Sequence, residues 1–411
     1  MKKKALALVL AFILICSATG CNNGAARNMS GQIGANPVQI HHEKEGDILT
    51  NHFALELFKK SFKKDGNTII SPMSVLCALA MTANGAKGET QAQMEEVLGM
   101  SVDQLNQAVY TYRNSLPDEK KCKVTLSNSI WFTEHVRFTL SEEFLQTNAD
   151  YYGAEIYEAP FDSSTVKDIN NWIKNNTDGM IEHVINEIPA SAVMYLINAL
   201  TFDAEWAQIY EDYQIQDGIF TMEDGMTKYV DYMHSQVNYY LESEYGTGFM
   251  KPYKGEKCAF AAFLPEEGMT VKEFLDTLDG EELARIFANV QNVPVVTQLP
   301  KFESEYEVSM VEMLREMGMV DAFDIETADF SGLGTSEDGN IYIDEVLHKA
   351  YINVDEKGTE AGAVTSVVAA TGDSVVVEEP KSVILDRPFV YMIVDLDNQV
   401  PLFVGAQMIF E

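Results

Sequence analysis

Hydrophobic residues begin to recur at helical spacing soon after residue 50. Phe53, Leu57 and Phe58 fall on one face of a helix, and Phe62 continues the same stripe. The preceding residues 22–47 are polar, contain several glycines and show no period. This change of pattern predicts that a globular domain begins close to residue 48.

The chain after this helix carries start and stop signals for two more helices. Ser71 can cap a helix, Pro72 suits its first position, and Asn84 precedes a glycine that can end it. Thr90 is then expected to cap a second helix over residues 91–100. Two helices in direct succession are therefore predicted near the start of the domain.

Strand-like and helical segments interleave along the rest of the chain without a regular βαβ rhythm. The strand-like runs are 124–132, 191–202, 260–265, 293–300, 341–354 and 389–396. The helical stretches are 142–151, 166–175 and 308–318. This order predicts an α+β fold, in which one domain over residues 48–411 has large mixed β-sheets and surrounding helices.

The N-terminus has the pattern of a targeting segment. Three lysines precede twelve apolar residues, 5–16, which are too few to span a bilayer but suit a signal peptide. The sequence "SATGC", residues 17–21, resembles a bacterial lipobox, with Ala18 where leucine is usual. That resemblance implies a lipoprotein signal peptide over residues 1–20 and lipidation at Cys21. Ordinary signal-peptidase cleavage is the alternative, and in both cases the protein is exported.

If Cys21 is lipidated, residues 21–47 become a flexible linker between the lipid and the domain. A flexible chain of this length has a root-mean-square reach of roughly 28 Å. The protein is then expected to be anchored to a membrane at the cell surface or in the cell envelope.

Net charge narrows the possible partners. The chain has 63 acidic and 29 basic residues, for a formal charge of −34. Such a charge opposes binding to nucleic acid or to anionic lipid through a basic face. A solvated acidic surface is the simpler interpretation, and cationic partners are the alternative.

Cysteine spacing gives no sign of a disulfide framework or a metal site. Cys77, Cys122 and Cys258 are far apart in the sequence, and no C-x-x-C motif occurs. Cys77 lies in an apolar run and is interpreted as a small buried hydrophobic residue. Neither a metal, a cofactor nor a redox role is predicted.

Catalytic motifs are also missing from the sequence. It contains no G-x-S-x-G, H-E-x-x-H or G-x-x-x-x-G-K-[ST]. Ser331 and His348 could act as a nucleophile and a base, but their spacing does not support it, and a structural histidine is favoured. The protein is therefore not expected to be an enzyme.

A segment near the C-terminus, residues 359–380, contains no lysine, arginine or aromatic residue. In an extended conformation from Thr359, one face carries only small, uncharged side chains, as a strand needs if it must enter a packed sheet. Gly358 is expected to act as a pivot. A permanent strand is the alternative, but it would be unusually long, and Gly372 followed by Asp373 interrupts it.

The sequence "EKGTEAGAVT", residues 356–365, resembles the hinge of the serpins, the serine protease inhibitors. Further segments are similar to serpin sequence blocks and occur in the same order: 67–90, 169–181, 196–206, 251–255, 299–303, 328–333, 348–361 and 386–393. The resemblance covers nearly all of residues 50–411. It implies a serpin fold with an exposed reactive-centre loop.

The resemblance also implies a mechanism of inhibition by a suicide substrate. In serpins a protease cleaves the loop and forms an acyl-enzyme, and the hinge then inserts as a strand and traps the protease. The expected hinge residues are Glu356, Gly358, Thr359, Glu360, Ala361, Gly362, Ala363, Val364 and Thr365. By the same analogy, Trp206 lies near the top of the insertion path, and Ser71, Asn198 and His348 belong to the fold and its opening.

Serpin spacing, counted from the hinge glutamate, predicts the reactive bond. If Glu356 is the seventeenth residue before the cut, Gly372 and Asp373 flank the bond. Counting back from "DRPF" favours Val377 instead. The count from the hinge is preferred, because the inserted length must match the strand that it fills, and the window is Ala370, Thr371, Gly372 and Asp373. Small residues in this bait suit elastase-like or subtilisin-like serine proteases, or papain-like cysteine proteases, with small apolar pockets.

Other functions remain open at this stage. A non-inhibitory serpin, acting as a surface binding protein, would be cleaved without trapping its protease. A lipid-anchored solute-binding protein fits the leader alone, and a hydrolase lacks a motif. A monomer that binds target proteases is the favoured expectation.

Overall fold

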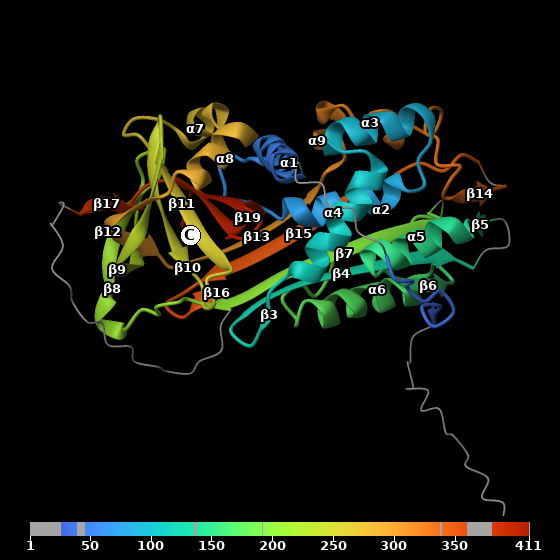
Figure 1. The fold of residues 1–411 in the computed structure, drawn as a ribbon, viewed down its shortest axis with the longest axis horizontal. Coiled ribbons are helices and arrows are strands. Elements are labelled where there is room, and N and C mark those ends of the chain that lie inside the picture. The colour runs from blue at the N-terminus through green and yellow to red at the C-terminus, as the bar shows by residue number, and fades with distance from the viewer. Residues whose placement is uncertain are drawn as a thin grey trace, which may run out of the picture.

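The structure is a computed structural model, and it describes residues 26–38, 46–134, 138–190, 192–337, 339–359 and 380–410. Two large β-sheets share one core, and most of the helices gather on the same side of them (Figure 1). No helix among the described residues is long and apolar enough to cross a membrane.

The first sheet, called sheet A below, has eight strands. In spatial order they are β1 (Arg27–Asn28), β6 (Glu155–Ala159), β4 (Cys122–Thr133), β7 (Met194–Glu205), β16 (Gly358–Thr359), β15 (Leu347–Val354) and β13 (Phe302–Ser309), with β3 (Asp118–Glu119) paired to β4. Strands β4 and β7 pair antiparallel along almost their whole length. The described part of β16 consists of Gly358 and Thr359, and it lies between two long strands.

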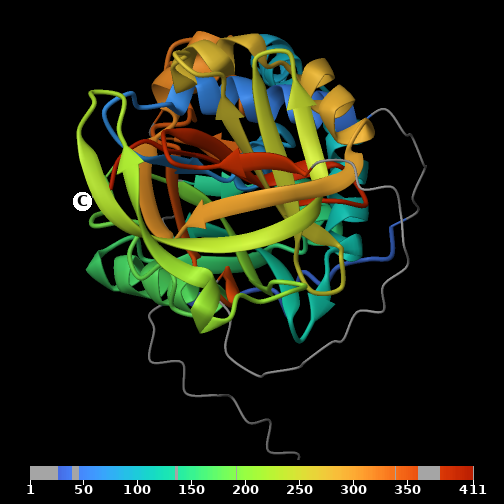
Figure 2. The ribbon, with the colours of Figure 1, turned by 90° about the vertical axis from the view of Figure 1, so that its left-hand side faces the viewer.

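The second sheet, called sheet B below, has nine strands and lies beside sheet A. In spatial order they are β17 (Lys381–Ile384), β12 (Gln291–Pro300), β9 (Thr227–Ser243), β10 (Gly246–Pro252), β11 (Cys258–Pro265), β18 (Phe389–Asp395), β19 (Val400–Gln407) and β2 (Thr68–Ile70), with β8 (Ile215–Thr221) paired to β9. Every residue of β11, β18 and β19 is buried. Figure 2 shows the curved strands of this sheet below helices α7 and α8.

Most of the described helices lie on the same side of the two sheets (Figure 1). They are α1 (Gly46–Ser61), α2 (Pro72–Ala83), α3 (Gly88–Leu98), α4 (Val102–Ser115), α5 (Glu142–Tyr152), α7 (Val271–Thr277), α8 (Gly280–Ala288) and α9 (Val311–Met317). Helix α2 begins where the sequence predicts, because the Ser71 hydroxyl accepts a hydrogen bond from the Ser74 amide at 3.3 Å. A small two-stranded sheet joins β5 (Phe138–Leu140) to β14 (Gly334–Ser336).

Helix α6 (Ser163–Asn176) lies on the opposite face of sheet A from α2 and α4 (Figure 1). It encloses a second, smaller hydrophobic core. There Trp131 of β4 stacks on Tyr157 of β6, with ring centroids 4.1 Å apart, and Trp172 of α6 packs in the same cluster. Sheet A is therefore covered on both faces.

Part of the predicted flexible linker contacts the domain, so the prediction of a free tether is wrong for residues 26–38. Arg27 and Asn28 form β1 and pair with β6. The Asn36 amide donates a hydrogen bond of 2.6 Å to the Asp150 carboxylate. The polar, aperiodic sequence gave no sign of this contact, because a two-residue edge strand needs only backbone groups and a free sheet edge to bind.

The other predicted helices and strands are present, with two differences. Thr90 does not cap a helix: it is buried inside α3, and its hydroxyl accepts a hydrogen bond from the Asp329 amide at 2.9 Å. The predicted strand 341–354 is a strand only from Leu347 onward. Several elements were not predicted at all, among them α4, α7, α8, β10, β13 and β19. The longest of the unpredicted strands, β9, mixes charged and aromatic side chains over 17 residues without a clean alternation.

Candidate strand-insertion site

A gap separates β7 from β15 along most of sheet A. At one end, the described residues of β16 join them: Gly358 pairs with Glu205, and Thr359 pairs with Ala204 and Val354. Along the rest of the β7 edge, no described strand pairs with it on this side. Both strands therefore present main-chain groups toward a space of about one strand's width.

A cavity of about 880 Å³ occupies this gap. Both strands line it over most of their length, together with residues 184–190 and 339–346 and the start of α2. Most of the side chains around it are small or apolar, and residues Met194 to Asn198 of β7 are only partly buried there. The cavity can hold an extended segment whose inward side chains are small and uncharged.

The first turn of α2 is hydrogen-bonded to both walls of the gap. On one side, the Ser74 hydroxyl donates to the Asn198 side-chain oxygen of β7, and the Asn198 amide donates to Asn128 of β4 at 2.7 Å. On the other side, the Ser71 amide donates to Nε2 of His348 in β15 at 3.1 Å. The contact requires a neutral imidazole on that nitrogen, and burial lowers the pKa of His348 to about 4.

The hinge enters the sheet through a tight turn. The Asp355 carboxylate accepts hydrogen bonds from the amides of Lys357 at 2.8 Å and Gly358 at 3.1 Å. A Cβ atom on Gly358 would lie 2.0 Å from the carbonyl oxygen of Ala204. The close approach of two backbones thus explains a glycine at position 358, while its role as a pivot stays a prediction.

Trp206 is hydrogen-bonded to the turn that begins at Asp355. Its indole Nε1 donates to the Asp355 carbonyl at 2.9 Å, and its backbone amide donates to the Lys357 carbonyl at 2.9 Å. Its ring stacks on Tyr253 with centroids 4.5 Å apart, and the Tyr253 hydroxyl is 2.6 Å from the Thr359 hydroxyl. Asp355, Lys357 and Thr359 are therefore held at the end of the gap where β16 lies, which is called the mouth of the gap below.

A buried lysine lies under the same aromatic cluster. Lys251 is 3% exposed, and its Nζ lies 4.2 Å from the centroid of the Tyr210 ring and 5.4 Å from that of Trp206. Burial lowers the pKa of Lys251 to about 7. The ammonium group of Lys251 at the mouth of the gap is thus stabilised mainly by cation–π contacts with Tyr210 and Trp206.

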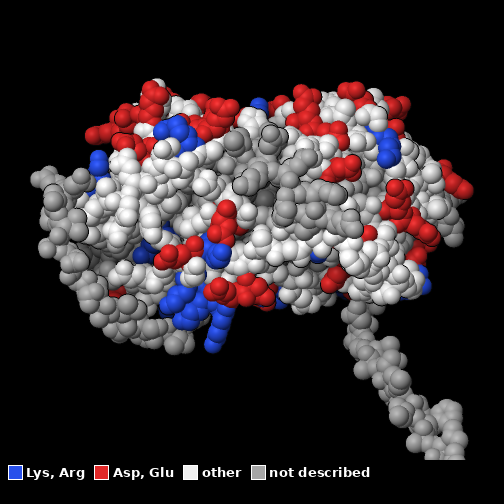
Figure 3. Space-filling view, viewed as in Figure 1, with Lys and Arg blue, Asp and Glu red and all other residues white. Residues whose placement is uncertain are grey.

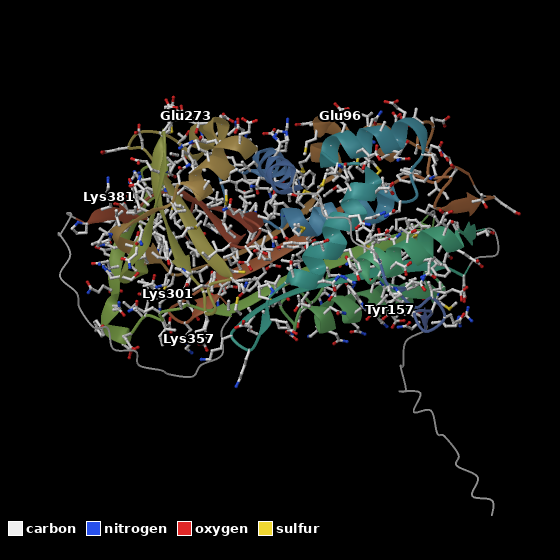
Figure 4. The ribbon with its side chains drawn as sticks, in the orientation of Figure 1. Glu96, Tyr157, Glu273, Lys301, Lys357 and Lys381 are labelled. Carbon is white, nitrogen blue, oxygen red and sulfur yellow. The ribbon has the colours of Figure 1, made fainter. Side chains whose placement is uncertain are left out.

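Glu356, the first expected hinge residue, forms an ion pair with Lys301 at 2.8 Å. This hydrogen-bonded partner holds the pKa of Glu356 below its usual value. Figure 4 shows Lys301 and Lys357 at the same end of the molecule, next to β16. The rest of the surface agrees with the charge of the chain, since Asp and Glu cover much of the helical side in Figure 3.

A gap in a large sheet, with a glycine-containing hinge at its mouth, is the arrangement that the sequence resemblance implies. The family model for serpins, described as serine protease inhibitors, matches residues 49–409. The chain belongs to the serpin family.

Relatives of this serpin span archaea and mammals. An uncharacterised serpin-like protein of Thermococcus kodakarensis is 30% identical over 368 residues, which are 87% of this chain and 84% of the relative. Leukocyte elastase inhibitor A of Rattus norvegicus is 27% identical over 369 residues, which are 86% of this chain and 96% of the relative.

Solved serpin structures share the fold. The native state of the thermophilic serpin tengpin is 47% identical, with a TM-score of 0.87, and the match covers 94% of this chain and all of tengpin. The latent state of tengpin is 43% identical, with a TM-score of 0.81 and coverage of 91% and 100%. The α+β single-domain serpin fold predicted from the sequence is confirmed.

The structure describes only part of the predicted site. Glu356, Gly358 and Thr359 lie together at the mouth of the gap, whereas the rest of the hinge, the reactive-bond window and the lipidation site lie outside the described residues: Glu360, Ala361, Gly362, Ala363, Val364, Thr365, Ala370, Thr371, Gly372, Asp373 and Cys21. Within the part of the chain that is described, no group of three His, Cys, Asp or Glu residues could hold a metal.

Two further candidate residues can be placed. Ser331 bonds to Asp329 at 2.7 Å, while the Nε2 of His348 accepts from Ser71, so these two do not form a nucleophile and base. Sequence reasoning did not single out Tyr253, Lys251 and Lys301 as parts of the site. Their role depends on which strands meet at the mouth of the gap, and local sequence does not carry that information.

Proposed function

We propose that this serpin inhibits proteases as a suicide substrate, with the gap between β7 and β15 as the place where its cleaved loop inserts. Serpins are generally protease inhibitors rather than enzymes. The observation that carries the proposal is the hinge itself: β16 already occupies the mouth of the gap, and the chain beyond Thr359 continues from there.

The protease supplies the nucleophile. Its active-site oxygen or sulfur attacks the carbonyl carbon of the reactive bond, the peptide bond breaks, and the amino group of the following residue leaves. The N-terminal side of the loop stays bonded to the protease as an acyl-enzyme. The C-terminal side remains attached through β17, which pairs in parallel with β12.

Insertion then adds a strand to sheet A. Once the bond is cut, the segment after Thr359 is tethered at one end only, and its backbone groups can pair with both free edges of the gap. The uncharged face that begins at Thr359 can pass over the core without burying a charge. Because each added pair stabilises the next, the acyl-linked protease is carried along sheet A and trapped.

The reactive bond is proposed to lie within Ala370–Asp373, with Gly372–Asp373 as the single best choice. Proteases with small apolar specificity pockets suit this bait, as in elastase-like and subtilisin-like enzymes and some papain-like cysteine proteases. One relative is named leukocyte elastase inhibitor A, which supports an elastase-like target. Trypsin-like and chymotrypsin-like pockets find no lysine, arginine or aromatic residue in the loop, whereas Asp373 would suit an Asp-specific protease.

Export and lipidation at Cys21 remain part of the proposal. Cleavage before Cys21 would leave the domain, as a monomer, on a lipid anchor at the cell surface or in the envelope. The mass of the N-terminal peptide from membrane-extracted protein tests it. A diacylated or triacylated Cys21 peptide is expected, and an unmodified N-terminus beyond Cys21 would contradict it.

A second function fits one observation. Structures of thyroxine-binding globulin in complex with thyroxine share this fold at 24% identity, with a TM-score of 0.77, so the fold alone does not establish inhibition. This serpin could instead be a non-inhibitory surface binding protein. It would then be cleaved without a covalent complex.

The test mixes the purified full chain with pancreatic elastase and, separately, with subtilisin, followed by denaturing gels and mass analysis of the released C-terminal peptide. A band at the summed mass is expected, and the first residue of the peptide names the bond. Clean cleavage without that band, or a stable complex with trypsin but none with elastase, would contradict the proposal.

The variant Gly358→Ala tests whether the pairing of β16 is needed to trap the protease. Its Cβ would lie 2.0 Å from the Ala204 carbonyl oxygen, so β16 could not keep its pairing. The variant is expected to be cleaved at the same bond but to give at least tenfold less covalent complex. Gly66→Ala, where a Cβ meets nothing within 4 Å, should behave like the unaltered protein.

A further inference from the structure

The structure brings together two cysteines that are far apart in the sequence. Cys122 is the first residue of β4 in sheet A, and Cys258 is the first residue of β11 in sheet B. Both are buried, with 1% and 0% exposure. Both cysteines are free, and a side-chain hydrogen bond between them is the first cause that lowers the pKa of Cys122 and raises that of Cys258.

Backbone hydrogen bonds hold the two segments together independently of the thiols. The Glu205 amide donates to the Lys121 carbonyl at 3.0 Å, and the Lys254 amide donates to the Glu205 carbonyl at 2.8 Å. Glu205 of β7 thus connects the residue before Cys122 to the hairpin that leads to Cys258. The Lys121 ammonium also pairs with the Glu205 carboxylate at 2.7 Å. The two cysteines therefore meet because the main chain places them together.

Neither a metal nor the third cysteine accounts for this pair. In the described part of the chain, Cys122 and Cys258 have no third ligating residue that would complete a metal site. Cys77 is separate, since its sulfur contacts the sulfur of Met73 at 3.9 Å, and burial raises its pKa to about 12. The pair therefore consists of two buried thiols that interact with each other and have no third ligand among the described residues.

We propose that Cys122 and Cys258 form an oxidisable dithiol site, whose disulfide cross-links sheet A to sheet B beside the hinge. Each thiol gives up one proton and one electron, and a sulfur–sulfur bond forms between them. The acceptor is an oxidised thiol-exchange compound, whose own disulfide takes up the two electrons and two protons and becomes two thiols. Export, as proposed above, would expose the folding chain to such acceptors.

The position of the bond gives it a consequence for the gap. Cys122 pairs across the strands with Ala204, and Ala204 pairs with Thr359 of β16. The disulfide would therefore hold the β4–β7 pair to sheet B, one strand away from the hinge. It would close a long loop of the unfolded chain and stabilise the native state. Any effect on trapping rests on the proposed inhibitory function.

The experiment measures the disulfide without using a protease. The full chain is refolded and equilibrated in oxidised or in reduced glutathione, so that the buried thiols are accessible while the bond can form. It is then denatured and alkylated without reductant, and its peptides are mapped by mass. In oxidised glutathione we expect one linked peptide joining Cys122 to Cys258, with Cys77 alkylated; in reduced glutathione we expect all three alkylated.

Variants separate the bond from simple loss of packing. The thermal midpoint of the unaltered chain and of Cys77→Ser should rise by several degrees in oxidised glutathione, whereas that of Cys122→Ser should not change. Full alkylation of Cys122 and Cys258 after oxidation, or linkage of either to Cys77, would overturn the proposal. Because peptide mapping uses the unaltered chain, a variant that fails to fold leaves the test decisive.

Discussion

Sheet B and the gap side of sheet A differ in how completely their strands are packed. In β11, β18 and β19 every residue is buried, whereas the first five residues of β7 are only partly buried and face a cavity of about 880 Å³. One chain thus builds a fully packed sheet next to a sheet that keeps room for one more strand. Stability resides mainly in sheet B, and the capacity to change resides in sheet A.

The contrast also appears in the polar residues. The buried centre of sheet B consists almost entirely of apolar side chains, such as Phe260 and Leu402. The two strands that line the gap, β7 and β15, are instead linked through hydrogen bonds of Asn198 and His348 to the start of α2. Such directional contacts can be exchanged for others when a strand enters, while close packing cannot. The predictions below test this division, from the largest expected effect to the smallest.

Truncating the centre of sheet B should cause the greatest loss of stability. Phe260 is fully buried and lies against Tyr391 at a centroid distance of 5.8 Å. Phe260→Ala is expected to lower the free energy of unfolding by about 3–5 kcal/mol, measured by urea denaturation. Leu196→Ala, in the partly buried edge of β7, should cost less than half as much. Equal losses would contradict the division between the sheets.

Acid should weaken the contact between β15 and α2. The pKa of His348 is about 4 in the folded protein, against roughly 6.5 in the unfolded chain. Between these values the unfolded chain binds more protons, so stability falls as the pH decreases from 6.5 to 4, by up to about 3 kcal/mol. The measurement compares unfolding at several pH values with that of His348→Gln. A variant with the same pH dependence as the unaltered protein would exclude this histidine.

Removing the buried charge at the mouth of the gap should stabilise the native state. Lys251 has a pKa of about 7 when folded, against roughly 10.4 when unfolded. Its destabilising effect is therefore full below pH 7 and fades as the pH rises toward 10. Lys251→Met should raise stability by about 1–4 kcal/mol at pH 6, less the cation–π contacts it loses.

Thermal unfolding of Lys251→Met at pH 6 and pH 9 checks this sign. The gain should shrink at the higher pH, because the unaltered lysine is then neutral in the folded state. Lys257→Met, at an exposed lysine paired with Asp397, is the matched control and should show little change at either pH. A gain that grows with pH would show that burial of the charge is not the cause.

The ion pair at the hinge should matter least for stability. Lys301 and Glu356 have side chains that are 27% and 31% exposed, and their separation is 2.8 Å. Lys301→Met is expected to cost less than about 1 kcal/mol, measured by urea denaturation in low salt. If it costs as much as Phe260→Ala, the mouth of the gap would be a main source of stability, against the division proposed here.

The sequence predicted the fold better than it predicted the site. Periodicity and capping residues such as Ser71 predicted most of the helices and several of the long strands, because these signals are local. The prediction that Thr90 caps a helix was wrong, because the sequence cannot distinguish a capping threonine from a buried one that bonds to a distant amide. The hinge was visible because its composition is unusual over many residues.

Contacts between distant segments could not be predicted. Lys301 pairs with Glu356, and Cys122 meets Cys258, only because strands from different sheets converge at the mouth of the gap. Cysteine spacing gave no sign of this contact between Cys122 and Cys258. The contact of residues 26–38 with β6 was hidden for the same reason, since it depends on a free edge elsewhere in the fold.

The central claim is that the gap in sheet A accepts the chain's own loop after cleavage. The most direct measurement is the thermal midpoint of the full chain before and after elastase cuts the loop, with the peptide mass confirming a single cut. Insertion pairs a new strand along both edges of the gap, so the midpoint is expected to rise by tens of degrees. A cleaved protein whose midpoint is unchanged or lower would show that the gap does not take up the loop.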